Sequence, residues 1–310
     1  MTDALLSVRR LRVTFQTASG PLRVVDDLDF NLRPFESLAV IGESGSGKSV
    51  VGHAIMRLLD DSACVAGEVW FQGRDVYRMT GAELAGIRGT ALVLIPQSPM
   101  SALDPVMRLG AQIGEVAAKN TVAGGDDAQA RTMDALDRVG FAQPAVICRS
   151  YAHRLSGGMC ERVLIAMALT ANAALVIADE PTKGLDAPAR ATVLRLLTQI
   201  GARTAVLMIT HDLLAASQCA RTAVMYGGQL VEHGPTGLIL QQPVHPYTRR
   251  LLDAQPCRGL KPIPGRFDLS TLRGGGCRFR NRCDQAGGIC ATAPPVRHIA
   301  GHGMIRCHFA

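Results

Sequence analysis

The sequence predicts an α/β fold with an open sheet, and two features predict it. Short apolar runs have the length and composition of buried strands, and helical patterns alternate with them, at Leu38–Ile41, Ala91–Ile95, Leu175–Ala178 and Thr204–Thr210. A polar or charged residue follows each of these runs within two positions. Ligands of open α/β sheets bind outside the carboxyl ends of the strands, so we expect the functional site there.

The stretch after the first run carries the clearest chemistry. Its sequence, GESGSGKS, fits the phosphate-binding pattern G-x-x-x-x-G-K-[ST] and precedes a helix expected from Ser49 to about Leu59. Glycines let successive N–H groups turn toward one phosphate, and the positive end of the helix favours the same anion. Lys48 would reach the β and γ phosphates, and the Ser49 hydroxyl would ligate Mg²⁺. A plain Gly/Ser surface loop would not need this lysine and serine in frame. The residues of the motif are Gly42, Glu43, Ser44, Gly45, Ser46, Gly47, Lys48 and Ser49.

Further elements are expected on both sides of this loop. Residues 5–40 alternate as short strands do. Phe15 lies on one of them and is a candidate platform for an adenine ring, although an ordinary half-buried strand aromatic has the same spacing. A strand is expected at Gly67–Phe71 and a helix at Thr80–Arg88. Gln97 follows the second apolar run, at the edge where ligands bind.

A helical insertion comes next. Helical periodicity extends from Met107 to about Ser150, with a break at Gly124–Asp127. The sequence LSGG then precedes a helix expected at Val163–Leu169, and Ser156 is a good N-cap for it. This second helix start could bind an anion, and it suggests that the γ-phosphate of a nucleotide held by another chain lies there. The alternative interpretation is a plain capped helix with no ligand. The residues of the motif are Leu155, Ser156, Gly157 and Gly158.

Charged and polar residues end the last two apolar runs. We expect Asp179 to hold Mg²⁺ through water, and Glu180 to orient or deprotonate an attacking water. His211 could contact the γ-phosphate or that water, although a lone histidine is most often structural. Gly184–Asp186 precedes a helix expected at Ala189–Ile200.

The composition excludes several classes of protein. With 47% hydrophobic residues the chain can form a core, and it has neither a secretory signal nor an apolar run near about 18 residues. We therefore expect a cytosolic protein, or one held at a membrane by partners. The net charge of +7 suits a surface near anionic lipid or a nucleotide. Nucleic-acid binding is disfavoured because no compact Lys/Arg run interleaves with aromatic residues.

The composition changes in the last part of the chain. After a hairpin expected at Thr222–Tyr226 and Gln229–Glu232, Pro and Gly become frequent from about Pro243 and strand-like runs stop. This extension has little core of its own, but four of the nine cysteines lie in it with the spacing C-x5-C-x6-C-x16-C. Four thiolates suit tetrahedral zinc or a four-iron cluster, and unligated thiols are the alternative. These are Cys277, Cys283, Cys290 and Cys307, whereas Cys64, Cys148, Cys160, Cys219 and Cys257 are scattered and suit small apolar positions.

Together these motifs resemble those of the ATP-binding subunits of ABC transporters. They correspond to the phosphate loop at Gly42–Ser49, the glutamine loop at Gln97, the signature at Leu155–Gly158, the acidic pair Asp179-Glu180, the D-loop at Gly184–Asp186 and the switch histidine His211. The resemblance implies a P-loop NTPase (RecA-like) core with an antiparallel β subdomain and a helical signature subdomain over about 98–165. It also implies an ATP-binding domain over 1–245 and a C-terminal extension over 246–310.

Three stretches narrow the resemblance to oligopeptide/dipeptide importers. They are QSPMSALDP at Gln97–Pro105, HPYT at His245–Thr248 and GCRFRNRC at Gly276–Cys283. In similar subunits the four cysteines hold a [4Fe-4S] cluster, with Zn²⁺ as the alternative here. The related nickel importers are the nearest alternative within the family.

The resemblance also implies a mechanism and partners. A second ATP-binding subunit, expected to be a paralogue, would pair head to tail, so that each ATP lies between the phosphate loop of one chain and the LSGG segment of the other. Phe15 would stack on adenine, Gln97 would sense Mg²⁺ and the membrane subunits, and Asp186 would act across the dimer. Lys48, Glu180 and His211 would serve catalysis. Hydrolysis would drive alternating access in two permease subunits at the cytoplasmic face of the cell membrane, while a separate binding protein selects the peptide.

Some residues depart from the family pattern. Cys160 and Glu161 stand where similar proteins carry Arg and Gln, and Gly184 stands where Ala is commoner. We expect the lost positive charge and the added negative charge to make this helix start less attractive to phosphate.

Two other classes of protein are the competing interpretations of the sequence. A non-transport ABC protein, such as a translation or DNA-repair factor, would carry two nucleotide domains or a long coiled coil, and a non-hydrolysing partner would not need Glu180 and His211.

Overall fold

The computed structural model describes residues 4–120 and 125–310, which form two compact units. We call them the phosphate-loop unit, which holds Gly42–Ser49, and the acidic-pair unit, which holds Asp179 and Glu180. The phosphate-loop unit comprises Leu6–Leu32, Ser37–Tyr77 and Ile209–Ala310, and the acidic-pair unit comprises Met1–Leu5, Arg33–Glu36 and Arg78–Met208.

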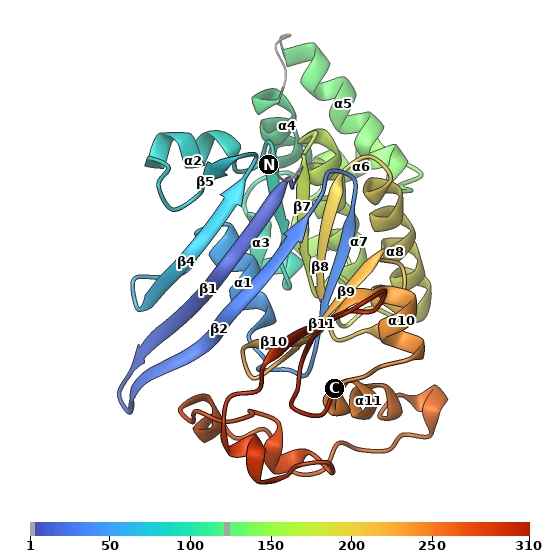
Figure 1. Ribbon diagram of the computed structural model, residues 1–310. Helices are drawn as coiled ribbons and strands as arrows, with labels where there is room; N and C mark the ends of the chain where they lie inside the picture. The colour runs from blue at the N-terminus through green and yellow to red at the C-terminus, as the bar shows by residue number, and fades with distance from the viewer. Residues whose placement is uncertain (1–3, 121–124) are drawn as a thin grey trace. The chain divides into compact units, whose positions relative to one another are not determined.

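The phosphate-loop unit contains an antiparallel sheet with the strand order β2-β1-β4-β5, whose long blue strands lie side by side in Figure 1. Its strands are β1 (Leu6–Thr17), β2 (Gly20–Leu32), β4 (Ala63–Phe71) and β5 (Arg74–Asp75). The short strands expected in this region are joined into longer ones. In β1 the pairing shifts between Val8 and Leu11, where Arg10 has φ 46°, so a bulge lets one strand continue where two were expected.

The same unit holds five further strands in the order β11-β12-β10-β9-β3. They are β3 (Ser37–Ile41), β9 (Arg221–Tyr226), β10 (Gln229–Pro235), β11 (Val296–Ile299) and β12 (Gly303–Arg306). β3 and β9 are parallel, whereas β9 and β10 form the predicted hairpin. Gly227 and Gly228 both have positive φ, 53° and 84°, as a two-residue turn between twisted strands requires.

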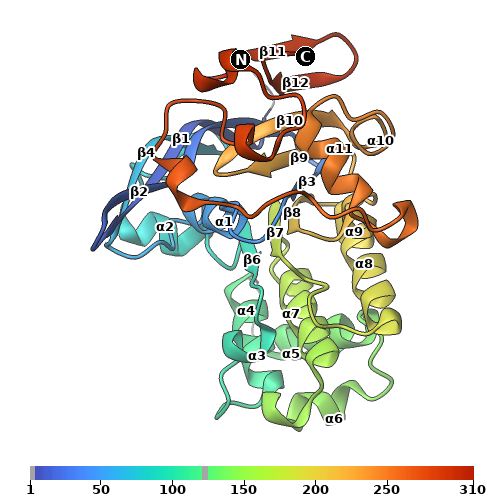
Figure 2. The ribbon, with the colours of Figure 1, turned by 90° about the horizontal axis from the view of Figure 1, so that it is seen from below.

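The expectation that strands stop after Pro243 is wrong. β12 pairs with β10 through Ile305 and Met304, and β11 pairs with β12, so the red hairpin lies beside β10 in Figures 1 and 2. Every residue of β11 is exposed, and only Ile305 of β12 is buried. An edge hairpin with so few buried positions has no apolar run that a sequence pattern could detect.

The helices of the phosphate-loop unit are short. They are α1 (Lys48–Ile55), α9 (Leu213–Ala216), α10 (Thr236–Gln241) and α11 (Pro246–Asp253), with 3₁₀ turns at Pro256–Arg258, Leu269–Leu272, Arg280–Arg282 and Gly288–Ala291. α1 ends before the expected Leu59 because Arg57, two residues after its last position, has φ 51°.

The acidic-pair unit contains the strand order β8-β7-β6 and most of the longer helices. β6 (Leu92–Ile95) and β7 (Leu175–Asp179) are parallel, and the last two residues of β8 (Ala205–Thr210) belong to the phosphate-loop unit. The helices are α2 (Gly81–Ile87), α3 (Pro99–Ala102), α4 (Leu109–Lys119), α5 (Gly125–Arg138), α6 (Pro144–Arg149), α7 (Gly157–Thr170) and α8 (Ala187–Gly201), with a 3₁₀ turn at Ala152–Arg154.

The predicted helical insertion is confirmed. α4 packs on α5, α6 and α7, and these helices gather in one group in Figure 2. The break expected at Gly124–Asp127 is placed differently, because Gly125 already begins α5, while Gly124 lies outside the described residues. The helix expected at Thr80–Arg88 is α2, which Thr80 and Glu83 open with a capping box.

Candidate nucleotide-binding site

The phosphate loop runs from the end of β3 to the start of α1 and has no room for side chains at two glycines. Gly47 has φ 96°, and a Cβ there would lie 2.7 Å from the carbonyl oxygen of Val24. A Cβ at Gly42 would lie 2.1 Å from the carbonyl oxygen of Met225. Both distances are shorter than a real contact, so these positions require glycine.

The polar groups of the loop suit an anion. Lys48 is buried, and its Nζ donates to the carbonyl oxygens of Gly42 (2.8 Å) and Glu43 (3.0 Å). The Ser46 hydroxyl is also buried and has no hydrogen-bond partner within the described residues. A phosphate would supply oxygens to both groups, and the start of α1 adds its positive dipole end.

Two more predicted residues belong to the same unit. Phe15 is half-buried on β1, where it pairs with Leu22 of β2 and Ala63 of β4. His211 is exposed just after β8, and the next residue, Asp212, caps α9 through the N–H of Leu214 at 2.9 Å. An exposed imidazole at the carboxyl end of a strand lies at the edge of the sheet where ligands of α/β proteins bind.

The other predicted residues belong to the acidic-pair unit. Gln97 is half-buried after β6. Asp179 and Glu180 are buried at the end of β7, with 2% and 8% of their surface exposed. Glu180 has φ 51°, a strained conformation for a non-glycine residue that often marks a functional position. Carboxylate and amide oxygens are ligands that Mg²⁺ accepts in proteins.

The LSGG segment lies in the same unit, at the start of α7. Ser156 caps this helix as predicted, since its Oγ accepts a hydrogen bond from the N–H of Met159 at 3.3 Å. Gly157 is exposed and Gly158 is half-buried, so the helix start is open to solvent. Asp186 caps α8 in the same way, through the N–H of Ala189 at 2.9 Å.

The expectation that Glu161 adds a negative charge is wrong at neutral pH. The side chain is only 3% exposed, its Oε1 has no hydrogen-bond partner within the described residues, and burial raises its pKa to about 8. The carboxyl group is therefore mostly protonated and neutral, like the amide it replaces. Cys160 is fully buried, and its thiol lies 3.2 Å from the sulfur of Met100 and 3.6 Å from the carbonyl oxygen of Ala152.

Two residues of the C-terminal extension reach the phosphate loop, and the sequence pattern did not predict this. The Tyr247 hydroxyl accepts a hydrogen bond from the N–H of Glu43 at 2.9 Å. The Arg282 guanidinium donates to both carboxylate oxygens of Glu43, at 2.7 and 3.1 Å. Both residues fall within the stretches HPYT and GCRFRNRC, which were notable only for their resemblance to a family.

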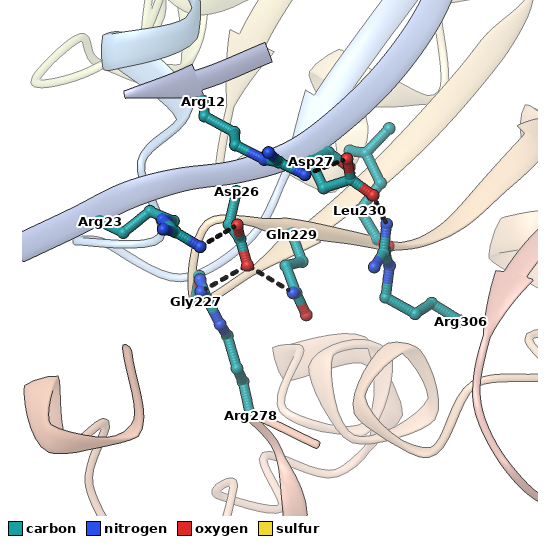
Figure 3. Close-up of polar contacts among 9 residues, drawn as sticks. All are labelled: Arg12, Arg23, Asp26, Asp27, Gly227, Gln229, Leu230, Arg278 and Arg306. Atoms are coloured by element: carbon teal, nitrogen blue, oxygen red, sulfur yellow. Dashed lines mark hydrogen bonds and ion pairs between the residues drawn. The ribbon is translucent and has the colours of Figure 1, made fainter. Parts of the chain in front are cut away.

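A third residue of the extension reaches β2. Arg278 donates to Asp26 Oδ2 at 2.7 Å and to the carbonyl oxygen of Gly227 (Figure 3). Gln229 and Arg23 also contact the Asp26 carboxylate, at 2.9 and 3.2 Å. One carboxylate therefore holds the extension, β2 and β10 together.

A neighbouring aspartate makes a similar junction. Asp27 pairs with Arg12 of β1 at 3.1 Å, and Arg306 of β12 lies 3.8 Å from its other oxygen. Arg306 also donates to the carbonyl oxygen of Leu230 at 3.2 Å. The edge hairpin is thus tied to the antiparallel sheet.

The four clustered cysteines all lie in the phosphate-loop unit. The N–H of Cys277 donates to the carbonyl oxygen of Cys290 at 2.9 Å. Burial raises the pKa of the Cys277 thiol, a hydrogen bond from the backbone of Phe279 lowers it, and electrostatic interaction with Cys290, Cys283 and Cys307 raises it. Across residues 4–120 and 125–310, however, no group of three or more His, Cys, Asp or Glu side chains is placed to hold a metal ion.

Two parts of the chain match known protein families. Residues 25–183 match the family described as ABC transporter. Residues 231–290 match the C-terminal region of the oligopeptide/dipeptide transporters.

Characterised relatives match over nearly the whole chain. The oligopeptide transport ATP-binding protein OppD of Escherichia coli is 39% identical, over 98% of this chain and 93% of its own length. The oligopeptide transport ATP-binding protein AppD of Bacillus subtilis is 38% identical, over 98% and 96%.

Solved structures show the same fold. A dimeric ATP-binding cassette in a post-hydrolysis state, bound to ADP and Pi, matches with a TM-score of 0.68 and 22% identity, over 74% of this chain and 98% of that one. This confirms the predicted α/β fold of the P-loop NTPase type. Within the described residues, no helix combines the length and the hydropathy that a membrane crossing needs.

Glu161→Gln should make stability less dependent on pH. The pKa of Glu161 rises from 4.5 to about 8 on folding, so between these values the folded chain holds a proton that the unfolded chain has lost. Its contribution to stability is therefore full at low pH and is lost as pH rises through about 8. Glutamine stays neutral, so thermal melts should give similar Tm values near pH 5 and a Tm higher by about 3 °C or more in the variant near pH 8.5.

The matched control is Glu115→Gln, which changes an exposed carboxylate on α4. It should leave the pH dependence of Tm unchanged. Parallel Tm curves for Glu161→Gln and the unmodified chain would contradict the assignment of a neutral, buried carboxyl group.

Proposed function

The chain belongs to the ABC transporter family and carries the C-terminal region of its oligopeptide/dipeptide branch, and we propose that it is the ATP-hydrolysing subunit of a membrane importer of peptides. The observation that carries this proposal is its identity of 38–39% with oligopeptide transport ATP-binding proteins over nearly its full length. The chain's own loop and buried acidic pair have the chemistry that ATP hydrolysis needs.

The phosphate loop binds the β and γ phosphates of ATP. Lys48 now donates to carbonyl oxygens within the loop, and it exchanges these for phosphate oxygens when ATP enters. Phe15 stacks on the adenine ring. The remaining loop residues contribute backbone N–H groups. A backbone donor does not depend on a side chain, so the lack of room for one at Gly42 and Gly47 does not prevent phosphate binding.

Residues at the ends of strands position the attacking water and accept its proton. Glu180 accepts the proton of the attacking water, and His211 holds the water and the γ-phosphate. Ser49, Gln97 and Asp179 would hold Mg²⁺, Asp179 through water, since their oxygens are ligands of the right kind. Bound Mg²⁺ supplies positive charge that neutralises the phosphate oxygens.

A second ATP-binding subunit, expected to be a paralogue, completes the site. The phosphates of the ATP bound to that second subunit lie against Ser156, Gly157 and Gly158 of this chain. The helix that starts there is capped, and its start is open to solvent. Asp186 acts across the pair. Two permease subunits hold the chain at the cytoplasmic face of the cell membrane, and a binding protein delivers the peptide. The ATP-binding domain spans 1–245, with its helical subdomain at about 98–165, and the extension spans 246–310.

The four cysteines are proposed to hold a [4Fe-4S] cluster. Their thiols influence one another electrostatically without forming a site for a metal ion within the described residues. The proposal rests on the four thiols and on the match of residues 231–290 to the oligopeptide/dipeptide transporters, and zinc is the alternative.

Glu180→Gln should abolish turnover without abolishing ATP binding. The amide keeps the shape of the side chain but cannot accept a proton, so kcat of the complex assembled with its permeases should fall about 100-fold or more. The ATPase rate and the ATP affinity would both be measured. Glu115→Gln, an exposed carboxylate on α4, is the matched control and should keep full activity. Retention of normal turnover by Glu180→Gln would sink the assigned role.

The cluster is tested by colour and metal content. The anaerobically purified chain should have a broad absorption band at about 400 nm and carry about four irons, and Cys277→Ser should lose most of the iron. Cys64→Ser, an exposed thiol on β4, should keep them. A colourless wild-type chain that carries zinc or no metal would refute the cluster while leaving the ATPase proposal intact.

A further inference from the structure

Glu43 is held on two sides by the C-terminal extension. Its carboxylate receives two parallel hydrogen bonds from Arg282, at 2.7 and 3.1 Å, and its backbone N–H donates to the Tyr247 hydroxyl at 2.9 Å. Glu43 directly follows the first glycine of the phosphate loop, and its carbonyl oxygen accepts a hydrogen bond from Lys48. One residue therefore joins the extension to the lysine that faces the phosphates.

The Arg282 guanidinium is fixed in place. It is only 7% exposed, its Nε donates to the carbonyl oxygen of Pro264 at 2.8 Å, and its Nη1 contacts the Tyr226 hydroxyl at 3.3 Å. Burying an ion pair adds little net stability, because desolvation offsets much of the attraction. What a bidentate, buried arginine provides is a defined geometry for its carboxylate partner.

Aromatic rings support this geometry. The Tyr247 ring is fully buried and packs against Tyr226 and Phe279, with ring centroids 4.6 and 5.3 Å apart. Tyr226 and Phe279 are themselves 5.1 Å apart, edge to face. Because all three rings contact one another, the Tyr247 hydroxyl has little freedom to leave Glu43.

The same segment also braces the other end of the loop. Arg278 donates to the carbonyl oxygen of Gly227 and to Asp26 (Figure 3). The next residue, Gly228, donates its N–H to the carbonyl oxygen of Ser46 at 3.0 Å, and its carbonyl oxygen accepts from the N–H of Asp26. The turn that Arg278 holds is thus hydrogen-bonded to the phosphate loop.

From these contacts we propose that Arg282, supported by Tyr247, is a positioning residue for phosphate binding. It holds Glu43, and through it the start of the loop and the acceptor of Lys48, in the conformation that receives the phosphates. The C-terminal extension therefore sets the affinity for nucleotide without touching it. This rests on the proposed ATP site and goes beyond it by assigning a role to the extension.

The test is nucleotide affinity of the full-length chain. Titration calorimetry with Mg²⁺ and ADP, which carries the β-phosphate but is not hydrolysed, should show Kd raised about 10-fold in Arg282→Ala. Arg282→Lys, which keeps the charge but not the paired donors, should fall between it and the wild type. Tyr247→Phe removes only the hydroxyl and should raise Kd about 3-fold.

Arg250→Ala is the matched control, because it removes another ion pair of the extension, with Asp284 at 2.6 Å, that does not reach the loop. Its Kd should stay within about twofold of the wild type. In the assembled complex, Arg282→Ala should raise the KM for ATP by a similar factor and keep kcat at saturating ATP.

A role in stability alone would give a different pattern. The proposal fails if Arg282→Ala and Tyr247→Phe bind ADP as Arg250→Ala does, or if kcat falls while KM stays unchanged. If Arg282→Ala does not fold, Tyr247→Phe decides the question by itself. A wild-type chain that does not bind ADP would refute the nucleotide site itself, which separates the two proposals.

Discussion

The phosphate loop has to hold several N–H groups in one direction before any phosphate arrives, and the rest of the phosphate-loop unit serves that constraint. A glycine-rich segment loses much conformational entropy when it is ordered, so it needs contacts from outside. They come from distant parts of the sequence. The carbonyl oxygens of Val24 and Met225 close on Gly47 and Gly42, and Gly228 bonds to the loop backbone. The loop is therefore ordered by tertiary structure more than by its own sequence.

Carboxyl groups with restricted exposure show two solutions in this chain. Asp26 and Glu43 are half-buried and pair with arginines of the extension, each at 2.7 Å. Glu161 has no such partner, and burial instead raises its pKa to about 8, so it loses its charge. The first solution fixes positions through directed bonds. The second leaves a neutral helix start, which does not repel a phosphate as a carboxylate would.

The sequence predicted those features whose physical cause is local. The phosphate loop, the cap of α7 by Ser156 and the turn at Gly227-Gly228 each depend on a few consecutive residues, and each is present. The contact of Arg282 with Glu43 joins residues 239 positions apart, and no periodicity announces it. The state of Glu161 was mispredicted for the same reason, because its charge depends on burial by residues far along the chain. The strands β11 and β12 were not predicted, because this edge hairpin buries only Ile305 and so shows no apolar run in the sequence.

Two of the four cysteines bound the part of the extension that contacts the phosphate loop. Arg278, Phe279 and Arg282 all lie between Cys277 and Cys283. The extension has few apolar residues with which to order that segment, and its aromatic contacts include Tyr226 of β9. A group bound by the thiols would fix both ends of the segment and so restrict the two arginines between them. The ordering of the extension and the geometry of the phosphate loop are then one physical problem, because Arg282 of that segment contacts Glu43 of the loop.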